Sequence, residues 1–312
     1  MIGVTISCSD PDAMTRMFVD VLGWEIATRG KIDAELEACW GIGTGSAGPE
    51  FTLLRSPGAD RGMLRVVAGA ERTRSRPVAA RWAGVEILVT RDLDQLCEQL
   101  DRHGSFATLH RPFDMDWSEF GSNIHRAFLG IGPGGTHLAF TMAVTEPDGR
   151  SFPAAAARVG HIFDVPLITG EFERSSRFYQ QTLGMVPFLE SRFVAGPWHE
   201  LWQIPEGSPV ALDILKGDAP GTGLGGIELQ GYDAALIDPE PARPDRLDAG
   251  ACLVTYSSID LDAAYRAVAS DHDAVVLSSP RSIGLPGYDG AQSFAFLGPG
   301  GERLEICDSS WV

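Results

Sequence analysis

The stretch Leu297-Gly-Pro-Gly-Gly-Glu-Arg-Leu-Glu-Ile-Cys307 decides how the rest of the chain is interpreted. It predicts a strand that ends at Leu297, a tight turn over the glycines, and a returning strand that carries Glu305. Because side chains alternate between the two faces of a strand, Glu305 points away from the face of its two apolar neighbours. We therefore expect Glu305 to face a cleft, with an exposed position on an edge strand as the alternative.

The same turn occurs earlier, in Gly132-Pro-Gly-Gly-Thr-His-Leu-Ala139, where Ala139 stands in the place of Glu305. Two predicted helices also end alike, at Leu22-Gly23 and at Leu183-Gly184. These repeats indicate that the chain is built from copies of one unit, each a strand, a helix and three further strands. Four such βαβββ units account for the 312 residues.

We expect an α+β protein in which the four units pair in chain order into two cup-shaped domains. The first domain would span residues 1–145 and the second residues 159–312, a division that the chain length also favours. Residues 146–158 mix Glu, Pro, Asp and Gly with a run of alanines, a composition that suits an interdomain linker.

Composition limits the kinds of partner. The net charge of −17 disfavours binding to nucleic acid and to anionic membranes, because both would be repelled. Five widely spaced cysteines without a CxxC pair predict free thiols in a reducing compartment. No apolar run approaches membrane-spanning length, and the N-terminus does not resemble a secretion signal. We expect a cytoplasmic protein that binds a small molecule, with a homodimer left open.

The segment Phe178-Tyr179 followed by Leu183-Gly184, together with the Gly-Pro-Gly-Gly-x-x-Leu-Glu turn, resembles the vicinal oxygen chelate superfamily. This superfamily includes glyoxalase I, bleomycin-resistance proteins and type I extradiol dioxygenases. The resemblance covers nearly the whole chain. It implies that each pair of units curls into a cup, with the ligands of a divalent metal on the first and last strands of each unit. It does not name a reaction, because one fold hosts many chemistries.

Carried over position by position, the resemblance implies different roles for the two halves. In the first half the four ligand places fall on or near residues that cannot bind a metal, namely Gly3, Leu53, Val85 and Ala139. In the second half they fall on His161 or Asp164, on Asp213, on Leu253 or Ala251, and on Glu305. The implied metal ligands are His161, Asp213 and Glu305, a set that suits Mn²⁺, Fe²⁺ or Mg²⁺. A metal-free cup stays open as the alternative.

The candidate catalytic residues are Glu305, His199 and Tyr288. His199 lies in a predicted strand and would serve as an acid or base if it faces the cup; a surface histidine is the alternative. Tyr288 belongs to a predicted loop placed to cover the mouth of the cup, with an ordinary turn as the alternative.

The sequence therefore predicts a small-molecule enzyme with lyase, isomerase or dioxygenase-like chemistry on an oxygenated, aromatic or enolisable substrate. Extradiol dioxygenases of this superfamily use two histidines and a glutamate, and the place of the second histidine here is Leu253 or Ala251. Ring cleavage is for that reason less expected than proton transfer. The alternative is a non-catalytic binding protein of the bleomycin-resistance type, in which aromatic residues fill a cup and no acids converge.

Overall fold

The structure is a computed structural model that describes residues 1–43, 48–72, 78, 81–146, 152–196, 199–217, 226–237 and 245–308. Four units follow one another along the chain. The first consists of β1 (Gly3–Cys8), α1 (Pro11–Arg16), η1 (Met17–Val21), β2 (Glu25–Lys31), α2 (Ala34–Trp40), β3 (Glu50–Arg55) and β4 (Met63–Ala68). The second consists of β5 (Arg81–Trp82), β6 (Gly84–Val89), α3 (Leu93–His103), β7 (Ala107–Asp116), η2 (Ser118–Phe120), β8 (Ile124–Ile131), η3 (Pro133–Gly135) and β9 (His137–Ala143).

The second half of the chain repeats this order. The third unit consists of β10 (Val159–Thr169), α4 (Phe172–Arg177), η4 (Phe178–Thr182), β11 (Val186–Val194), α5 (His199–Trp202), β12 (Pro209–Lys216), β13 (Gly226–Gly231) and η5 (Ala234–Leu236). The fourth consists of β14 (Gly250–Ser257), α6 (Leu261–Ser270), β15 (Val275–Val276), β16 (Arg281–Ser282), β17 (Gln292–Leu297) and β18 (Arg303–Cys307). The expected α+β architecture of four similar units forming two cups is confirmed.

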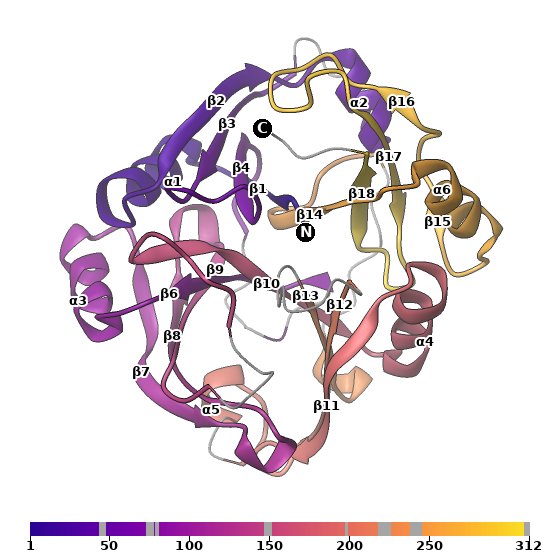
Figure 1. The fold of residues 1–312 in the computed structure, drawn as a ribbon. Helices are drawn as coiled ribbons and strands as arrows, with labels where there is room; N and C mark the ends of the chain where they lie inside the picture. The colour runs from indigo at the N-terminus through magenta and orange to yellow at the C-terminus, as the bar shows by residue number, and fades with distance from the viewer. Residues whose placement is uncertain are drawn as a thin grey trace.

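The units form two nine-stranded sheets, but they do not pair in chain order. Sheet A joins the first and fourth units in the order β15-β17-β18-β14-β1-β4-β3-β2, with β16 beside β17. Sheet B joins the second and third units in the order β11-β12-β13-β10-β6-β9-β8-β7, with β5 beside β10. Figure 1 shows this nesting: the first and last segments of the chain share the upper cup, and the two middle units share the lower one.

The expected pairing of consecutive units within 1–145 and within 159–312 is therefore wrong. The two central junctions are the antiparallel pairs β1–β14 and β6–β10, and each joins one half of the chain to the other. Nothing in the sequence of an apolar first strand specifies which of several similar strands becomes its partner. The repeat predicts the unit, whereas the partner depends on packing across the whole molecule.

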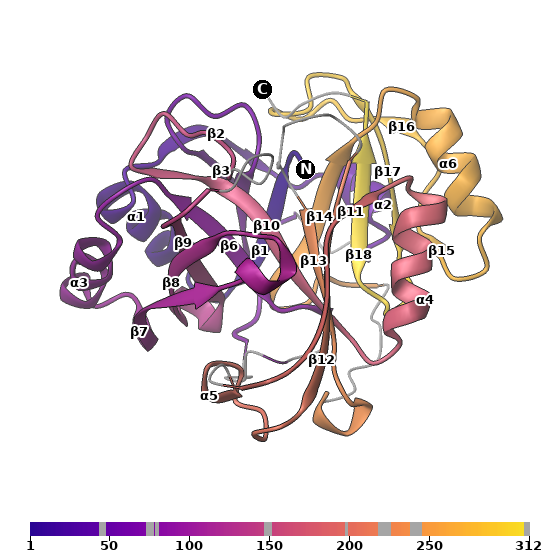
Figure 2. The same ribbon diagram turned by 60° about the horizontal axis from the view of Figure 1, so that its bottom comes forward.

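Strand alternation divides the interior into three layers. On β1, Val4 and Ile6 pack into the main core between the two sheets, whereas Thr5 lies on the concave face of sheet A. Helices α1 and α3 flank this core on one side, and α4 and α6 flank it on the other (Figure 2). Each cup has its own smaller apolar cluster. The concave faces are thus separate environments, which allows one cup to close while the other stays open.

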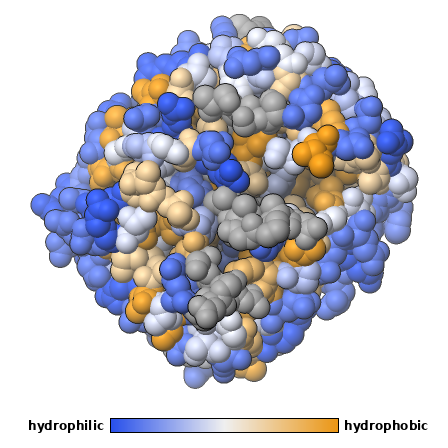
Figure 3. All heavy atoms as spheres, in the orientation of Figure 1, coloured by the Kyte–Doolittle hydropathy of each residue, from blue (hydrophilic) through white to orange (hydrophobic). Residues whose placement is uncertain are grey.

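The face in Figure 3 is largely hydrophilic, with separate apolar patches. Exposed large apolar side chains such as Val194, Ile259 and Val275 come from distant parts of the chain. All five cysteines are buried free thiols, as the sequence predicts. None of the helices in the described part of the chain has the length and apolarity that a membrane crossing needs.

Candidate functional site

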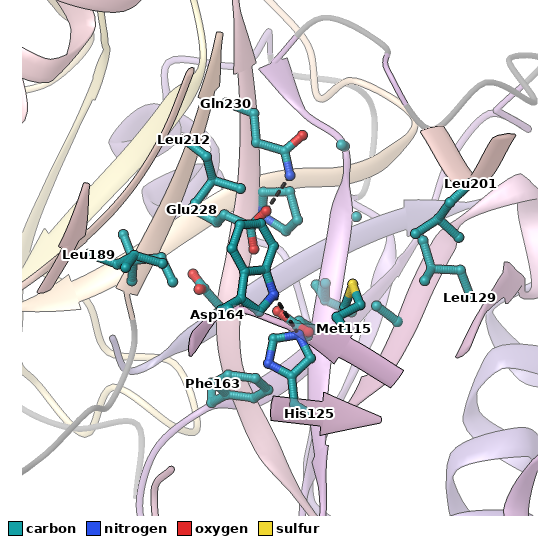
Figure 4. A pocket seen from close by; sticks show the side chains of 18 of the residues that line it. Met115, His125, Leu129, Phe163, Asp164, Leu189, Leu201, Leu212, Glu228 and Gln230 are labelled. Atoms are coloured by element: carbon teal, nitrogen blue, oxygen red, sulfur yellow. Dashed lines mark hydrogen bonds between the residues drawn. The ribbon is translucent and has the colours of Figure 1, made fainter. Parts of the chain in front are cut away.

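A cavity lies on the concave face of sheet B, and β6 through β13 all contribute to its wall. No lysine or arginine is present among the described residues that line it. Figure 4 shows part of this lining, with Gln230 and Glu228 toward one end of the view and His125 and Phe163 toward the other. Most lining side chains are apolar or aromatic: Met115, Trp117, Leu129, Phe152, Phe163, Phe188, Leu189, Leu201, Trp202, Leu212 and Ile214.

Three acidic side chains converge in this cavity. Glu86 of β6, Asp164 of β10 and Glu228 of β13 each offer an oxygen, and these oxygens all lie within 4.8 Å of one another. Glu86 stands opposite Asp164 in the β6–β10 ladder, and β13 pairs with β10 on its other side. Three neighbouring strands of one sheet therefore bring the acids together, although they are far apart in the sequence.

Neighbouring polar groups hold the acids in position. The Thr141 hydroxyl donates a hydrogen bond to Glu86, and the Gln230 amide donates one to Glu228. The backbone N–H of Val165 donates to Asp164 Oδ1 at 2.8 Å. Gln230 is itself fixed because the Tyr232 hydroxyl donates to its Oε1 at 2.5 Å. The cluster is thus a supported arrangement rather than a set of mobile surface acids.

Burial and mutual repulsion disfavour full ionisation of the cluster. Burial, then the charge of Glu228, raises the pKa of Glu86 to about 8. Burial, then the charges of Glu228 and Glu86, raises the pKa of Asp164 well above its ordinary value. Burial also raises the pKa of Glu228. Ionisation of all three acids at once around neutral pH is therefore unfavourable unless a cation is bound.

The donor set fits a hard divalent cation. Carboxylate oxygens are the ligands preferred by Mg²⁺, Mn²⁺ and Ca²⁺, and three of them meet here in one half-buried place. This converging group, which is the one found among the described residues, contains neither histidine nor cysteine. Its chemistry is therefore that of an oxygen site, unlike a thiol-rich zinc site.

Comparison with known proteins agrees with this architecture. Residues 158–306 match the model of the Glyoxalase/Bleomycin resistance protein/Dioxygenase superfamily. The segment of residues 158–306 therefore carries the sequence pattern of this superfamily. Among curated protein sequences, none matches the chain significantly.

Solved structures extend the superfamily fold to almost the whole chain. Glyoxalase I from Zea mays is 16% identical and superposes with a TM-score of 0.63, over 99% of this chain and 92% of that one. A point mutant of that enzyme gives a TM-score of 0.66 with the same identity and coverage. A provisionally assigned dioxygenase from Bacillus subtilis is 14% identical, with a TM-score of 0.60 over 98% of this chain and 84% of that one. At these identities the likeness shows the fold alone.

The structure does not bring together the expected metal ligands His161, Asp213 and Glu305. His161 and Asp213 belong to strands of sheet B, whereas Glu305 belongs to sheet A. Asp164, which the sequence leaves as the alternative to His161, does face the cavity. His161 instead lies beside the loop of residues 56–61. A β-carbon added at Gly62 would lie 2.9 Å from the His161 β-carbon and would collide with the Ile162 carbonyl oxygen, so the chain is closely packed here. Burial lowers the pKa of His161 to about 4.

Asp213 lies on the face of β12 away from the cavity. Its neighbours Leu212 and Ile214 line the cavity, whereas its own carboxylate receives Arg192 Nη1 at 2.7 Å. Ser176 Oγ donates to the other carboxylate oxygen at 3.3 Å. Asp213 therefore forms an ion pair with Arg192 of the same unit.

Glu305 and Tyr288 do meet, but in the closed cup of sheet A. The Tyr288 hydroxyl donates to both Glu305 oxygens, at 2.8 and 3.0 Å. Trp40 Nε1, Thr255 Oγ1 and Ser293 Oγ donate to the same carboxylate, at 3.1, 2.7 and 2.9 Å. Glu305 is fully buried. It points to the concave side of sheet A, but side chains fill that side, so Glu305 does not face the cleft that the sequence predicts.

An arginine completes the filling of this cup. The Arg65 guanidinium lies 4.9 Å from the ring centroid of Tyr288, 5.1 Å from that of Trp40 and 5.7 Å from that of Phe51. Cation–π contacts of this kind are strong when desolvated, and Arg65 is only 1% exposed. The chain therefore supplies its own cation inside sheet A.

The strand expected around His199 is wrong. His199 starts the short helix α5, and its Nδ1 lies 2.8 Å from the Gly196 carbonyl oxygen. The helix presents Leu201 and Trp202 to the cavity instead. The preceding residue, Trp198, lies outside the described residues.

Glu86 and Glu228 were not among the site residues predicted from the sequence. Both show the signal that singles out Glu305, because each acid stands between two aliphatic residues of a short strand, in Val85-Glu86-Ile87 and in Ile227-Glu228-Leu229. The position carried over from the superfamily was Val85, one residue from the acid that faces the cavity. Because side chains alternate along a strand, an error of one residue selects a side chain on the opposite face of the sheet.

Proposed function

We propose that the protein is a small-molecule enzyme of the vicinal oxygen chelate type and that the sheet B cavity is its active site. The observation that carries this proposal is the convergence of Glu86, Asp164 and Glu228 at the wall of an otherwise apolar cavity. Burying three acids together is unfavourable for the fold, so a chemical role accounts for them better than packing does. A drug-sequestering cup would need the aromatic wall alone.

The proposed reaction is proton transfer next to a carbonyl group of an apolar substrate, as in an isomerase or a lyase. Glu86, with a pKa of about 8, keeps a proton that it can donate at neutral pH, while an ionised neighbour can accept one. The acceptor removes a proton from the carbon next to the carbonyl, and the donor returns a proton at the new position. The apolar wall excludes water from the intermediate.

In a metal-assisted form of the reaction, the same three residues, then ionised, would hold a divalent metal ion in place of the protons. When bound there, the ion would polarise the substrate carbonyl and stabilise the negative charge that forms on its oxygen. Thr141, Gln230 and the Val165 N–H keep the carboxylates oriented toward their common centre. The remaining family ligand place falls on Ala139, which pairs with Glu86 and cannot coordinate a metal.

The function is tested by proton exchange. The protein, as purified, is incubated in D₂O with enolisable aromatic ketones, and deuterium incorporation next to the carbonyl is followed by NMR. We expect catalysed exchange that falls by about 100-fold or more in Glu228→Gln, as for loss of an acid–base group. Glu190→Gln, which removes an exposed carboxylate of the same sheet, is the matched control. Exchange that is not catalysed, or that is equal in both variants, would contradict the proposed reaction.

The metal is tested separately by elemental analysis of the purified protein. We expect about one divalent ion per chain, lost on dialysis against a chelator and strongly reduced in Glu228→Gln. Unchanged metal content in that variant would show that the cluster does not bind the metal.

The five buried free thiols support the cytoplasmic location expected from the sequence.

A further inference from the structure

The ring of His125 is held as a single tautomer inside the cavity. The Trp117 indole Nε1 donates a hydrogen bond to His125 Nε2 at 3.2 Å. Because an indole N–H can only donate, His125 Nε2 must be the unprotonated, accepting nitrogen. Burial also keeps this imidazole neutral, since it lowers the pKa of His125 to about 4. The proton of the neutral ring is therefore on Nδ1.

The resulting Nδ1–H group has nothing to bond to within the described residues. His125 Nδ1 is buried and has no hydrogen-bond partner there. Asn123 lines the same cavity and is 2% exposed, and its amide Nδ2 is also buried without a hydrogen-bond partner among the described residues. The Ser122 hydroxyl donates to the other side of that amide, Oδ1, at 3.2 Å. A buried donor without an acceptor is unfavourable, so two of them in one wall indicate a place for an acceptor atom of a ligand.

The charges in the cavity restrict what that acceptor can be. The described lining carries three acids and no lysine or arginine, which disfavours a carboxylate or a phosphate. A protonated amine would suit the acids, but it has no lone pair to accept a bond from His125. An uncharged carbonyl oxygen satisfies both conditions. The apolar wall between these polar groups suits a hydrocarbon ring.

We propose that His125, oriented by Trp117, is a specificity-determining residue that anchors an uncharged carbonyl oxygen of an aromatic substrate through its Nδ1–H. Asn123, two residues earlier in the same wall, offers its amide Nδ2 as a second donor. This proposal rests on the proposed function only in placing the substrate in the sheet B cavity. With His125 as the donor, the cavity should bind neutral aromatic ketones and aldehydes more tightly than acids and amines of equal size.

Three ring compounds of matched size test the charge preference: acetophenone is neutral and carries an acceptor, benzoate is an anion, and benzylamine is a cation. Each is titrated into the full-length protein while the indole N–H signal of Trp117, identified by its loss in Trp117→Phe, is followed by NMR. We expect acetophenone to bind most tightly. Tighter binding of benzoate or benzylamine, or no binding of acetophenone, would overturn the proposal.

Variants of His125 test the anchor itself. We expect His125→Phe to weaken acetophenone binding roughly 5- to 100-fold, the effect of one buried hydrogen bond. His125→Gln retains a donor and an acceptor and should restore most of the affinity. His272→Phe, at an exposed histidine outside the cavity, is the matched control and should bind as the parent does. Equal affinity in His125→Phe would overturn the proposal.

A direct measurement does not depend on whether the variants fold. In protein labelled with ¹⁵N at histidine, the His125 ring should show a protonated Nδ1 and an unprotonated Nε2 throughout pH 6 to 9. A protonated Nε2 would overturn the proposed donor. The failure of the two proposals is distinguishable. If ketone binding depends on His125 but Glu228→Gln exchanges protons as the parent does, the anchor stands and the enzyme function falls. If His125→Phe catalyses exchange as the parent does and binds acetophenone with unchanged affinity, the enzyme function stands and the anchor falls.

Discussion

The three acids of sheet B make folding stability depend on pH. Burial raises the pKa values of all three in the folded protein. For Glu86, the folded state therefore binds more protons than the unfolded state between the ordinary Glu value of 4.5 and the folded value of about 8. The contribution of this cluster to the free energy of unfolding should therefore be greatest below about pH 4.5 and should fall as the pH rises toward 8. Urea unfolding at several pH values measures this slope.

Two changes should reduce that slope. Saturating Mn²⁺ or Mg²⁺ neutralises the cluster and favours its ionised form, so stability near pH 8 should rise. Glu228→Gln removes a charge that raises the pKa values of Glu86 and Asp164, so the slope should become shallower. Glu190→Gln is exposed and should leave the slope as it is in the parent. An unchanged slope in Glu228→Gln would contradict the electrostatic account of the cluster.

Glu305 belongs to the architecture of sheet A. Replacing Glu305 by Gln converts one accepting oxygen into a donor that faces other donors, among them Trp40 and Tyr288. We expect the free energy of unfolding to fall by about 2–4 kcal/mol, as for other losses in buried charged networks. Ligand and metal binding in sheet B should not change. A Glu305→Gln protein that is fully stable but inactive would instead restore Glu305 as a site residue.

At the scale of single elements, the sequence predicted what depends on local chemistry. The helical segments η1 and η4 end at Val21 and Thr182, just before Gly23 and Gly184, as the two Leu-Gly pairs indicate. The strand expected at His199 failed because an apolar run of that length fits either a strand or a buried helical turn. The position of Glu305 was misjudged for a related reason: whether the concave side of a sheet is an open cleft depends on side chains from distant segments, and Trp40 and Tyr288 fill it here.

The turn between β17 and β18 depends on a contact from another unit. The Tyr179 hydroxyl at the end of the third unit's helix donates to Glu302 Oε1 at 2.5 Å, and the Gly300 N–H donates to Oε2 at 2.8 Å. Glu302 is only 1% exposed, and its burial raises its pKa. This buried carboxylate therefore fixes the Gly-Pro-Gly-Gly turn onto the helix that precedes β11.

Tyr179→Phe should weaken this junction. The variant retains the ring and removes the hydroxyl donor, so a buried carboxyl group loses a charge-assisted hydrogen bond. We expect the free energy of unfolding to fall by about 1.5–3 kcal/mol, measured by urea denaturation. Tyr265→Phe, at a half-buried tyrosine of α6 that packs on Phe294, is the matched control and should change stability by less than about 0.5 kcal/mol. Equal effects in the two variants would show that the Glu302 bond does not stabilise the turn.

At the scale of the whole molecule, the nesting of the units makes the two halves interdependent. The family model matches residues 158–306, a length that would suggest an autonomous domain. In the structure this segment holds only one side of each sheet, because β10 needs β6 and β14 needs β1 as antiparallel partners. The core between the sheets also combines residues of both halves, for example Phe18 with Val254. The cavity inherits this dependence, since Glu86 comes from the first half and Glu228 from the second.

Residues 159–312 expressed alone should consequently fail to form a stable monomer. Both central strands would expose an unpaired edge and their apolar faces, conditions that favour aggregation. Co-expression of 1–151 with 152–312 should instead give a 1:1 complex, because the break leaves every described strand intact and both antiparallel junctions can still form. Size-exclusion chromatography and circular dichroism distinguish these outcomes, with the uncut chain as the control. A monomeric 159–312 that unfolds cooperatively would show that units can pair in chain order, and the nested arrangement of the two sheets would then not be required for folding.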